Sequence, residues 1–351
     1  MAHIWVPKKR WSAPHSQRLE RWLGAQAVNE LSLQMRGWYG PPIAIGTVPG
    51  AVYAVGGGDF MGPISGGAGF TSLSDLIAEA SAGKRRDFLF EKAGPTGVAN
   101  ITSSLWGVGN YPPAGANASA APGGDAPTDA TLGAHLFQNP TGGDTQHFVS
   151  ADVLSTLAGN LLLYDRIFQV NKTMNSTATE AVTGVPTRYQ NTVAGSVDSA
   201  EGNFLFVEVG GTALAATAHN WTVCLYTDEG GNASTLPSLT GVSAAIVRRL
   251  DHATVGQWFA PPASGDRGIR TLTQMQASAL VATGVINFVI GHPLAWFPGL
   301  LGGGQGTIFD GINTAFNLVR IFDDAALAFL DAVRPATGTR TYTGIIRTVA
   351  G

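Results

Sequence analysis

The stretch TLTQMQASALVATGVINFVIGHPLAWFPGLLGGGQGTIF, residues 271–309, decides the fold class because it contains no Lys, Arg, Asp or Glu. Its segment Leu280–Leu301 is long enough to span a membrane as a helix. Asn287, His292 and Pro293 interrupt this segment, and polar side chains are costly in hydrocarbon unless they are paired. We therefore interpret the stretch as buried strands of a soluble protein and expect no membrane partner.

The whole chain is poor in charge. Lys, Arg, Asp and Glu make up 13% of its 351 residues, whereas globular proteins carry about 25%. A surface with so few ionic groups is poorly suited to solvation on all sides. The composition therefore predicts a self-assembling or partner-covered building block, and the 44% of apolar residues is sufficient for a sizeable core.

Turn-forming residues are frequent, with 46 glycines and 19 prolines, which favours turns and loops over long helices. Short apolar runs alternate with polar turns, as is typical of sandwiches and jelly rolls. We predict a mainly β fold: a sandwich or jelly-roll-like body with few short helices, long Gly/Ala/Pro loops and an extended N-terminal arm. The predicted strands are Leu161–Val170, Asn203–Val209, Trp221–Tyr226, Gly284–Ile290, Asn317–Phe322 and Thr341–Val349.

Helix signals are few. Ser72–Ala80 combines capping serines with an apolar stripe and is the clearest helix. Ser150–Leu157 is predicted to be a capped helical turn, and Ala325–Val333 fits either a helix or a strand.

Composition divides the chain into three segments. Residues 1–40 form a basic, Trp-rich arm, residues 41–148 a loop-rich segment with one short helix, and residues 149–351 a β-rich body. The second boundary follows from residues 107–146, which are dominated by Gly, Ala, Pro, Asn, Thr and Asp. Loops of this length are usually functional, linking or covered by a partner.

The N-terminal arm is the candidate interface. It has a surplus of four positive charges, whereas the formal net charge of the whole chain is −3. Large aromatic residues and Arg dominate interface energetics, so we expect the arm to lie on a neighbouring copy. We expect no dedicated nucleic-acid recognition, and the arm is the one segment whose charge suits a contact with nucleic acid. A short solvated tail, or tryptophans packed on the chain's own core, remain open. The candidate interface residues are Trp5, Lys8, Lys9, Arg10, Trp11 and Trp22.

No motif for catalysis, metal or cofactor binding stands out. The seven histidines form no His-Glu-x-x-His pattern, and a single cysteine excludes a multi-thiolate zinc site. Gly241–Ala245 lacks the second glycine of a nucleophile elbow, and Gly302–Thr307 lacks the lysine of a phosphate-binding loop. Cys224 lies in an apolar strand candidate and is expected to be inert. We expect no enzymatic activity, cofactor or metal.

Two stretches carry a family resemblance. They are LYDRIFQVNKTMNSTATEAVTGVPTRY (Leu163–Tyr189) and, further along, FVIGHPLAWFP (Phe288–Pro298) followed by DGINTAF (Asp310–Phe316). They resemble virion structural proteins of tailed bacteriophages, and the resemblance covers most of residues 70–351. It implies a virion component assembled in the host cytoplasm, with copies of itself and other virion proteins as partners. No catalytic residues come with it.

The position within the particle is a further expectation. A major shell protein of the common phage capsid fold would need a long spine helix, and the sequence shows helix signals of only two to three turns. This favours a cement or decoration protein of the head. A shell subunit, a β-sandwich module that binds glycans or a receptor, and a virion-associated hydrolase are the alternatives.

Overall fold

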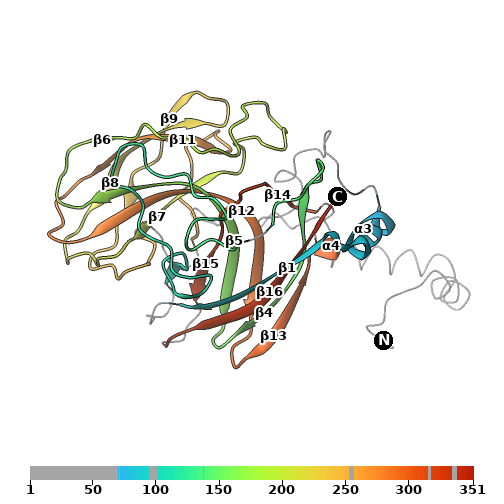
Figure 1. The fold of residues 1–351 in the computed structure, drawn as a ribbon. Helices are drawn as coiled ribbons and strands as arrows, with labels where there is room; N and C mark the ends of the chain where they lie inside the picture. Colours follow the sequence, from blue (N-terminus) through green and yellow to red (C-terminus); the bar gives the residue numbers. More distant parts are fainter. Residues whose placement is uncertain are drawn as a thin grey trace, which may run out of the picture. The chain divides into compact units, whose positions relative to one another are not determined.

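The computed structural model describes residues 70, 72–94, 101–136, 138–252, 257–314, 318–333 and 338–351. All of them lie in the unit Pro49–Gly351. The described chain is mainly β, as predicted, and its strands form three antiparallel sheets (Figure 1). We name them sheets I, II and III.

Sheet II is built around the pairing of two long strands and has the order β2-β15-β5-β12-β7. In β5 every residue from Leu161 to Lys172 is buried. A strand that is covered on both faces carries a continuous apolar run in place of an alternation, which explains why Leu280–Leu301 resembles a membrane span. The strands are β2 (Thr102–Ser104), β5 (Gly159–Thr173), β7 (Phe204–Val209), β12 (Val285–Leu300) and β15 (Leu327–Val333).

Sheet I has the order β13-β4-β16-β1-β3, and β14 also pairs with β4. The prediction of a helical turn at Ser150–Leu157 is wrong, because Ser150–Ser155 lies in β4. Ala151 and Val153 are buried and alternate with more exposed neighbours, and this period of two outweighs the capping signal of a serine. The strands are β1 (Arg85–Ala93), β3 (Asn110–Tyr111), β4 (Gln146–Ser155), β13 (Gln305–Asp310), β14 (Arg320–Ile321) and β16 (Thr341–Ala350).

Sheet III has the order β10-β8-β11-β6, and β9 pairs with β8. Its long strands β8 and β11 pair over most of their length. The turn Asp228–Asn232 connects β8 to β9, and in it Asp228 Oδ1 accepts from the Asn232 backbone N–H at 2.7 Å. The strands are β6 (Glu180–Ala181), β8 (Asn220–Asp228), β9 (Ala233–Thr235), β10 (Leu239–Thr240) and β11 (Ile269–Ala277).

The helix predicted at Ser72–Ala80 is present as α3 (Leu73–Glu79). Ser72 caps it by accepting from the Asp75 backbone N–H at 3.1 Å. A π-helical turn, Ala80–Lys84, leads from α3 into β1. The second α-helix among the described residues is the single turn α4 (Gly311–Thr314) after β13. None of the described helices has the length and apolarity that crossing a membrane requires.

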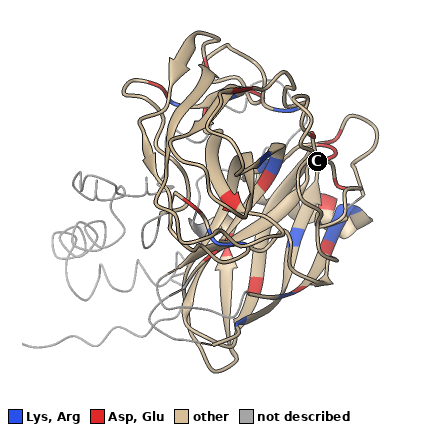
Figure 2. Ribbon diagram, turned by 90° about the vertical axis from the view of Figure 1, so that its left-hand side faces the viewer, with Lys and Arg blue, Asp and Glu red and all other residues tan. Residues whose placement is uncertain are grey.

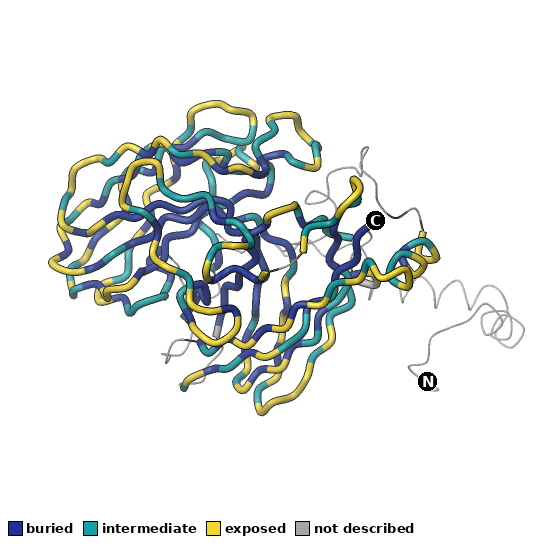
Figure 3. Tube along the Cα trace, viewed as in Figure 1, coloured by how far each residue is buried: buried dark blue, intermediate teal, exposed yellow. Residues whose placement is uncertain are grey.

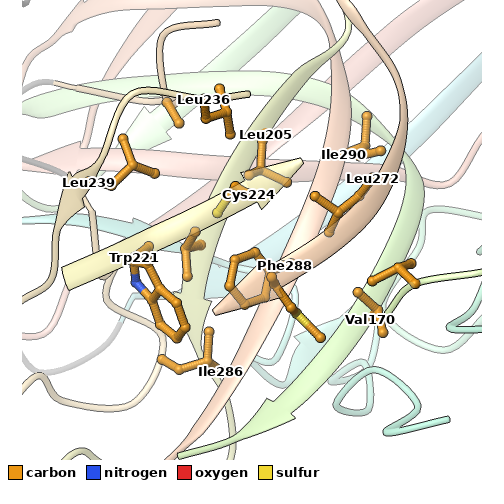
Figure 4. Close-up of a cluster of buried hydrophobic side chains, with 14 of the residues drawn as sticks. Val170, Leu205, Trp221, Cys224, Leu236, Leu239, Leu272, Ile286, Phe288 and Ile290 are labelled. Carbon is orange, nitrogen blue, oxygen red and sulfur yellow. The ribbon is translucent and has the colours of Figure 1, made fainter. Parts of the chain in front are cut away.

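Two hydrophobic clusters join sheet II to the other sheets. Leu161 and Leu163 of β5 pack with residues of sheet I. Beyond a register shift in the pairing of β5 with β12, Phe168 and Val170 pack with residues of sheet III. Figure 4 shows the second cluster, in which Trp221 and its neighbours from β8 face side chains from β12.

The remaining face of sheet II is covered by the loop-rich chain between β2 and β4. Trp106 packs there with Tyr164 of β5 and Phe206 of β7. An isolated bridge joins Asp125 to Gln169. This Gly/Ala/Pro-rich chain is therefore packed on the sheet along part of its length.

Candidate assembly surface

The face of sheet I that is turned away from sheet II carries exposed side chains on β1, β4 and β13, and we call it the outer face. Alternation along β1 creates it, since Phe88 and Phe90 are buried in the core while Leu89 and Glu91 point outward. Figure 3 shows the strands of sheet I with teal and yellow segments, in contrast to the dark blue of the strands of sheet II.

Apolar side chains lie on this outer face. Leu89 is 61% exposed, Leu154 45% and Ile308 75%. Ile345, which is partly buried, is opposite Leu89 on one side and Asp152 on the other, and Asp152 is opposite Ile308. One row across four strands therefore contains three apolar residues. We call Leu89, Leu154, Ile308 and Ile345 the apolar set.

Four of the charged side chains near the apolar set form two ion pairs with one another. Arg347 Nη2 donates to Asp152 Oδ2 at 2.5 Å, between β16 and β4. This hydrogen bond lowers the pKa of the Asp152 carboxyl. Arg85 forms a similar pair with Asp87 at 2.6 Å along β1. Since these charges are internally compensated, a partner that covers the face does not have to supply counter-charges for them.

The two edges of sheet I differ. On one side the sheet ends in β3, which has two residues and is followed by the cis peptide bond Tyr111–Pro112. On the other side it ends in β13, which has six residues and pairs with β4. Short edge strands and prolines protect a sheet against pairing with another chain, so the β3 edge is protected by both features.

Many of the scarce charged residues lie inside the body. Arg166 donates to Glu208 at 2.6 Å across sheet II, Arg188 to Asp165 at 2.7 Å, and Arg340 to Asp331 at 2.9 Å. Their burial leaves the surface even poorer in charge than the composition suggests, and Figure 2 shows long stretches of ribbon without a charged residue. The buried Lys, Arg, Asp and Glu residues of the described chain include Lys92, Asp165, Arg166, Lys172, Arg188, Glu208, Asp251, Asp331 and Arg340.

Lys92 is the buried cation that is bound by backbone carbonyls. Its Nζ donates to Val108 O at 2.9 Å and to Pro112 O at 2.7 Å. Burial, with a further contribution from the charge of Arg248, lowers the pKa of Lys92 to about 8. Lys92 thereby attaches the loop after β2 to β1, a structural role that the sequence pattern does not reveal.

His219 and Asp251 form a second buried polar centre. The His219 Nε2–H donates to Asp251 Oδ2 at 2.9 Å, and the Trp221 Nε1–H donates to the same oxygen at 2.7 Å. His219 Nδ1 faces the Thr217 carbonyl oxygen at 3.1 Å. Burial opposes the imidazolium charge, but the hydrogen bond and charge of Asp251 outweigh it, and the pKa of His219 is raised.

No group of three or more His, Cys, Asp or Glu within the described ranges has the geometry to hold a metal ion. Cys224 is buried, as expected, and burial raises the pKa of its thiol to about 12. The arm residues predicted to form an interface, listed above as Trp5 to Trp22, lie outside the described residues. Sequence reasoning did not find the apolar set, which becomes visible only through the strand register.

Comparisons with known proteins yield distant structural neighbours. No family model and no curated protein matches the chain. The solved structures to which it is similar include the VP2 subviral particle of infectious bursal disease virus, at 9% identity and a TM-score of 0.18, covering 84% of this chain and 86% of that one. Another is the Gx strain of that virus, at 8% identity and a TM-score of 0.16, covering 76% and 81%. These neighbours come from virus particles, and scores at this level do not establish a common fold.

Proposed function

We propose that this chain is a structural, non-enzymatic component of a virus particle and that it associates with copies of itself. The observation that carries the proposal is the apolar set on the outer face of sheet I, where Leu89 and Ile308 are 61% and 75% exposed. Exposed apolar residues that gather on one face of a protein mark surfaces that bind other proteins. A charge-poor chain with such a face gains more from a protein neighbour than from water.

The buried ion pairs support this proposal from a second direction. Ionic groups on a surface keep a protein soluble and apart from its copies. The pairs Arg166–Glu208 and Arg188–Asp165 lie in the core and contribute nothing to that repulsion. The exposed surface is thereby left with weak electrostatic protection against association.

The finer assignment rests on the sequence resemblance to tailed-bacteriophage virion proteins. On that basis the chain is a cement or decoration protein of the head, located in the virion, and residues 1–40 reach a neighbouring subunit. A specific contact of this kind buries about 1,600 Å² in total, and repetition over a particle adds avidity. A major shell subunit is the alternative within the same class.

The experiment compares the assembly of three full-length proteins by light scattering and electron microscopy over a range of concentrations. The wild type is expected to form oligomers, rings or lattices as concentration rises. Leu89→Asp places a charge in the apolar set and is expected to raise the protein concentration at which assembly begins at least tenfold. Leu132→Asp is the matched control, because Leu132 is 63% exposed but lies outside sheet I, and it should assemble as the wild type does. A wild type that stays monomeric at every concentration would overturn the proposal.

A further inference from the structure

The unprotected edge of sheet I is the strand β13. Natural edge strands block pairing with another chain through charged side chains, Lys above all, and through Pro. The sequence of β13, QGTIFD, contains no Lys, Arg or Pro, and its one charged residue is the terminal Asp310. Within the described ranges, β4 is the strand that pairs with it, and no described strand lies along its opposite edge. This edge is therefore available as a template for a further antiparallel strand.

The most exposed large apolar side chain of the described residues lies in the middle of this edge strand. Ile308 is 75% exposed, and β13 is otherwise exposed or half-buried along its length. Figure 3 shows β13 at the lower end of sheet I. A β-branched residue at this position favours pairing with another strand, because pairing packs its side chain. In the free monomer the same side chain is exposed to water on an edge that can pair with another chain.

We propose that β13 pairs antiparallel with β13 of a second copy, about a two-fold axis at Ile308, so that two copies of sheet I form one continuous sheet. The proposal rests on the proposed function and names one contact through which self-association occurs, in addition to the outer face. An isologous pairing of this kind needs a single self-complementary strand, and β13 satisfies that requirement.

The register follows from the faces of the strand. Ile308 points to the outer face, because it lies in the row of Leu89 and Asp152, and residues two positions apart share a face. Directly opposed residues of an antiparallel pair also share a face. An axis at Ile308 places Ile308 opposite its own copy, Thr307 opposite Phe309 of the second copy, and Gly306 opposite Asp310. Each face is preserved, the two isoleucines bury one another, and no charge opposes a like charge.

A cysteine at the axis tests the register directly. Two cysteines directly opposite on antiparallel strands have Cα atoms about 4.5–5.5 Å apart, which a disulfide bond can span. The full-length Ile308→Cys variant carries one accessible thiol, since Cys224 is buried and the pKa of its thiol is raised to about 12. Mild oxidation followed by a non-reducing gel is expected to show covalent dimers.

The matched control is Leu89→Cys, because Leu89 is 61% exposed on the same outer face but lies on β1, away from the β13 edge. Ile308→Cys should cross-link at least tenfold faster than this control. Ile308→Lys, which places a charge on the edge, should raise the dimer dissociation constant at least tenfold in sedimentation, with an unchanged circular dichroism spectrum.

The outcomes separate the two proposals. If Ile308→Cys cross-links no faster than Leu89→Cys while the wild type still assembles, the β13 contact is wrong and the proposed function stands. If the wild type remains monomeric at all concentrations, the proposed function fails, and the β13 contact fails with it.

Discussion

Arg166 Nη2 lies 2.6 Å from Glu208 Oε1, and the two side chains are 0% and 5% exposed. The pair joins β5 to β7 on the face of sheet II that the chain around Trp106 covers, with the guanidinium carbon 4.7 Å from the Trp106 ring centroid. Arg166 Nε also donates to Gln169 Oε1 at 2.7 Å. The charge is thus held by an anion, an amide and an aromatic ring.

Removal of the anion should destabilise the fold strongly. Glu208→Gln keeps the shape of the side chain but leaves the Arg166 charge buried and uncompensated, which typically lowers the free energy of unfolding by about 3–5 kcal/mol. Urea denaturation followed by tryptophan fluorescence measures this change. Glu91→Gln, on the exposed side of β1, is the control and should change the free energy of unfolding by less than about 0.5 kcal/mol. Equal stability of the two variants would contradict the assigned role of the pair.

Acid should destabilise the protein through its buried histidines. Burial lowers the pKa of His252 to about 4 and that of His292 to about 3, from 6.5, and His135 and His147 are shifted in the same direction. Between pH 4 and 6.5 the unfolded chain therefore binds more protons than the folded chain, so stability falls as the pH decreases from 6.5. Each such histidine contributes up to a tenfold change in the folding equilibrium per pH unit. Denaturation at pH 5 and pH 7 checks this; a free energy of unfolding that is the same at both would contradict it.

His219 should show the opposite pH dependence. Its pKa is raised in the folded state by Asp251, so its stabilising contribution is present below pH 6.5 and is lost as the pH rises through the folded pKa. His219→Gln is therefore expected to lose more stability relative to the wild type at pH 6 than at pH 9. The variant His252→Gln supplies the comparison, because the pKa of His252 is lowered in the folded state, whereas that of His219 is raised. A stability deficit of His219→Gln that grows with pH would contradict the charged state assigned to His219.

The close packing of the loop around Gly123 against the chain that follows β6 can be tested with two glycines. A Cβ added at Gly184 would lie 1.8 Å from the Gly123 carbonyl oxygen, whereas a Cβ at Gly123 would meet no atom within 4 Å. Gly184→Ala should therefore lower the free energy of unfolding by about 1–3 kcal/mol, the usual range for overpacking. Gly123→Ala should change it little. Thermal unfolding of both variants measures the difference. If the two melt alike, the loop around Gly123 does not pack on this site.

Two of the strands that the sequence predicted are covered on both faces. β5 is buried without a break from Leu161 to Lys172, and β12 opens with the run Val285–Ile290, which is apolar except for Asn287. Mostly apolar runs of this kind are visible without a fold. β1 was not predicted. Its sequence, RRDFLFEKA, alternates between buried apolar and exposed residues over only a few positions, and most of its charges lie at the exposed ones. It forms a strand by pairing with β16, which lies more than 240 residues further along the chain. Ala325–Val333, left open between helix and strand, is β15 from Leu327 onward.

The candidate surface was beyond sequence reasoning for a physical reason. Leu89, Leu154 and Ile308 are far apart in the chain, and strand register alone places them on one face. The same holds for the buried ion pairs, since Arg166 and Glu208 are 42 positions apart. Composition alone led to the expectation that partners cover the protein. The residues that form the surface could be identified only from the pairing of the strands.

The central claim is that copies of this protein cover the outer face and β13 edge of sheet I. Hydrogen–deuterium exchange of the full-length chain, measured once under dilute conditions and once under concentrated ones, tests it most directly. The account predicts that peptides containing Ile308 and Leu89 exchange more slowly in the concentrated sample, while the peptide containing Leu132 is unchanged. Identical exchange of sheet I at both concentrations, in a sample that remains monomeric, would contradict it.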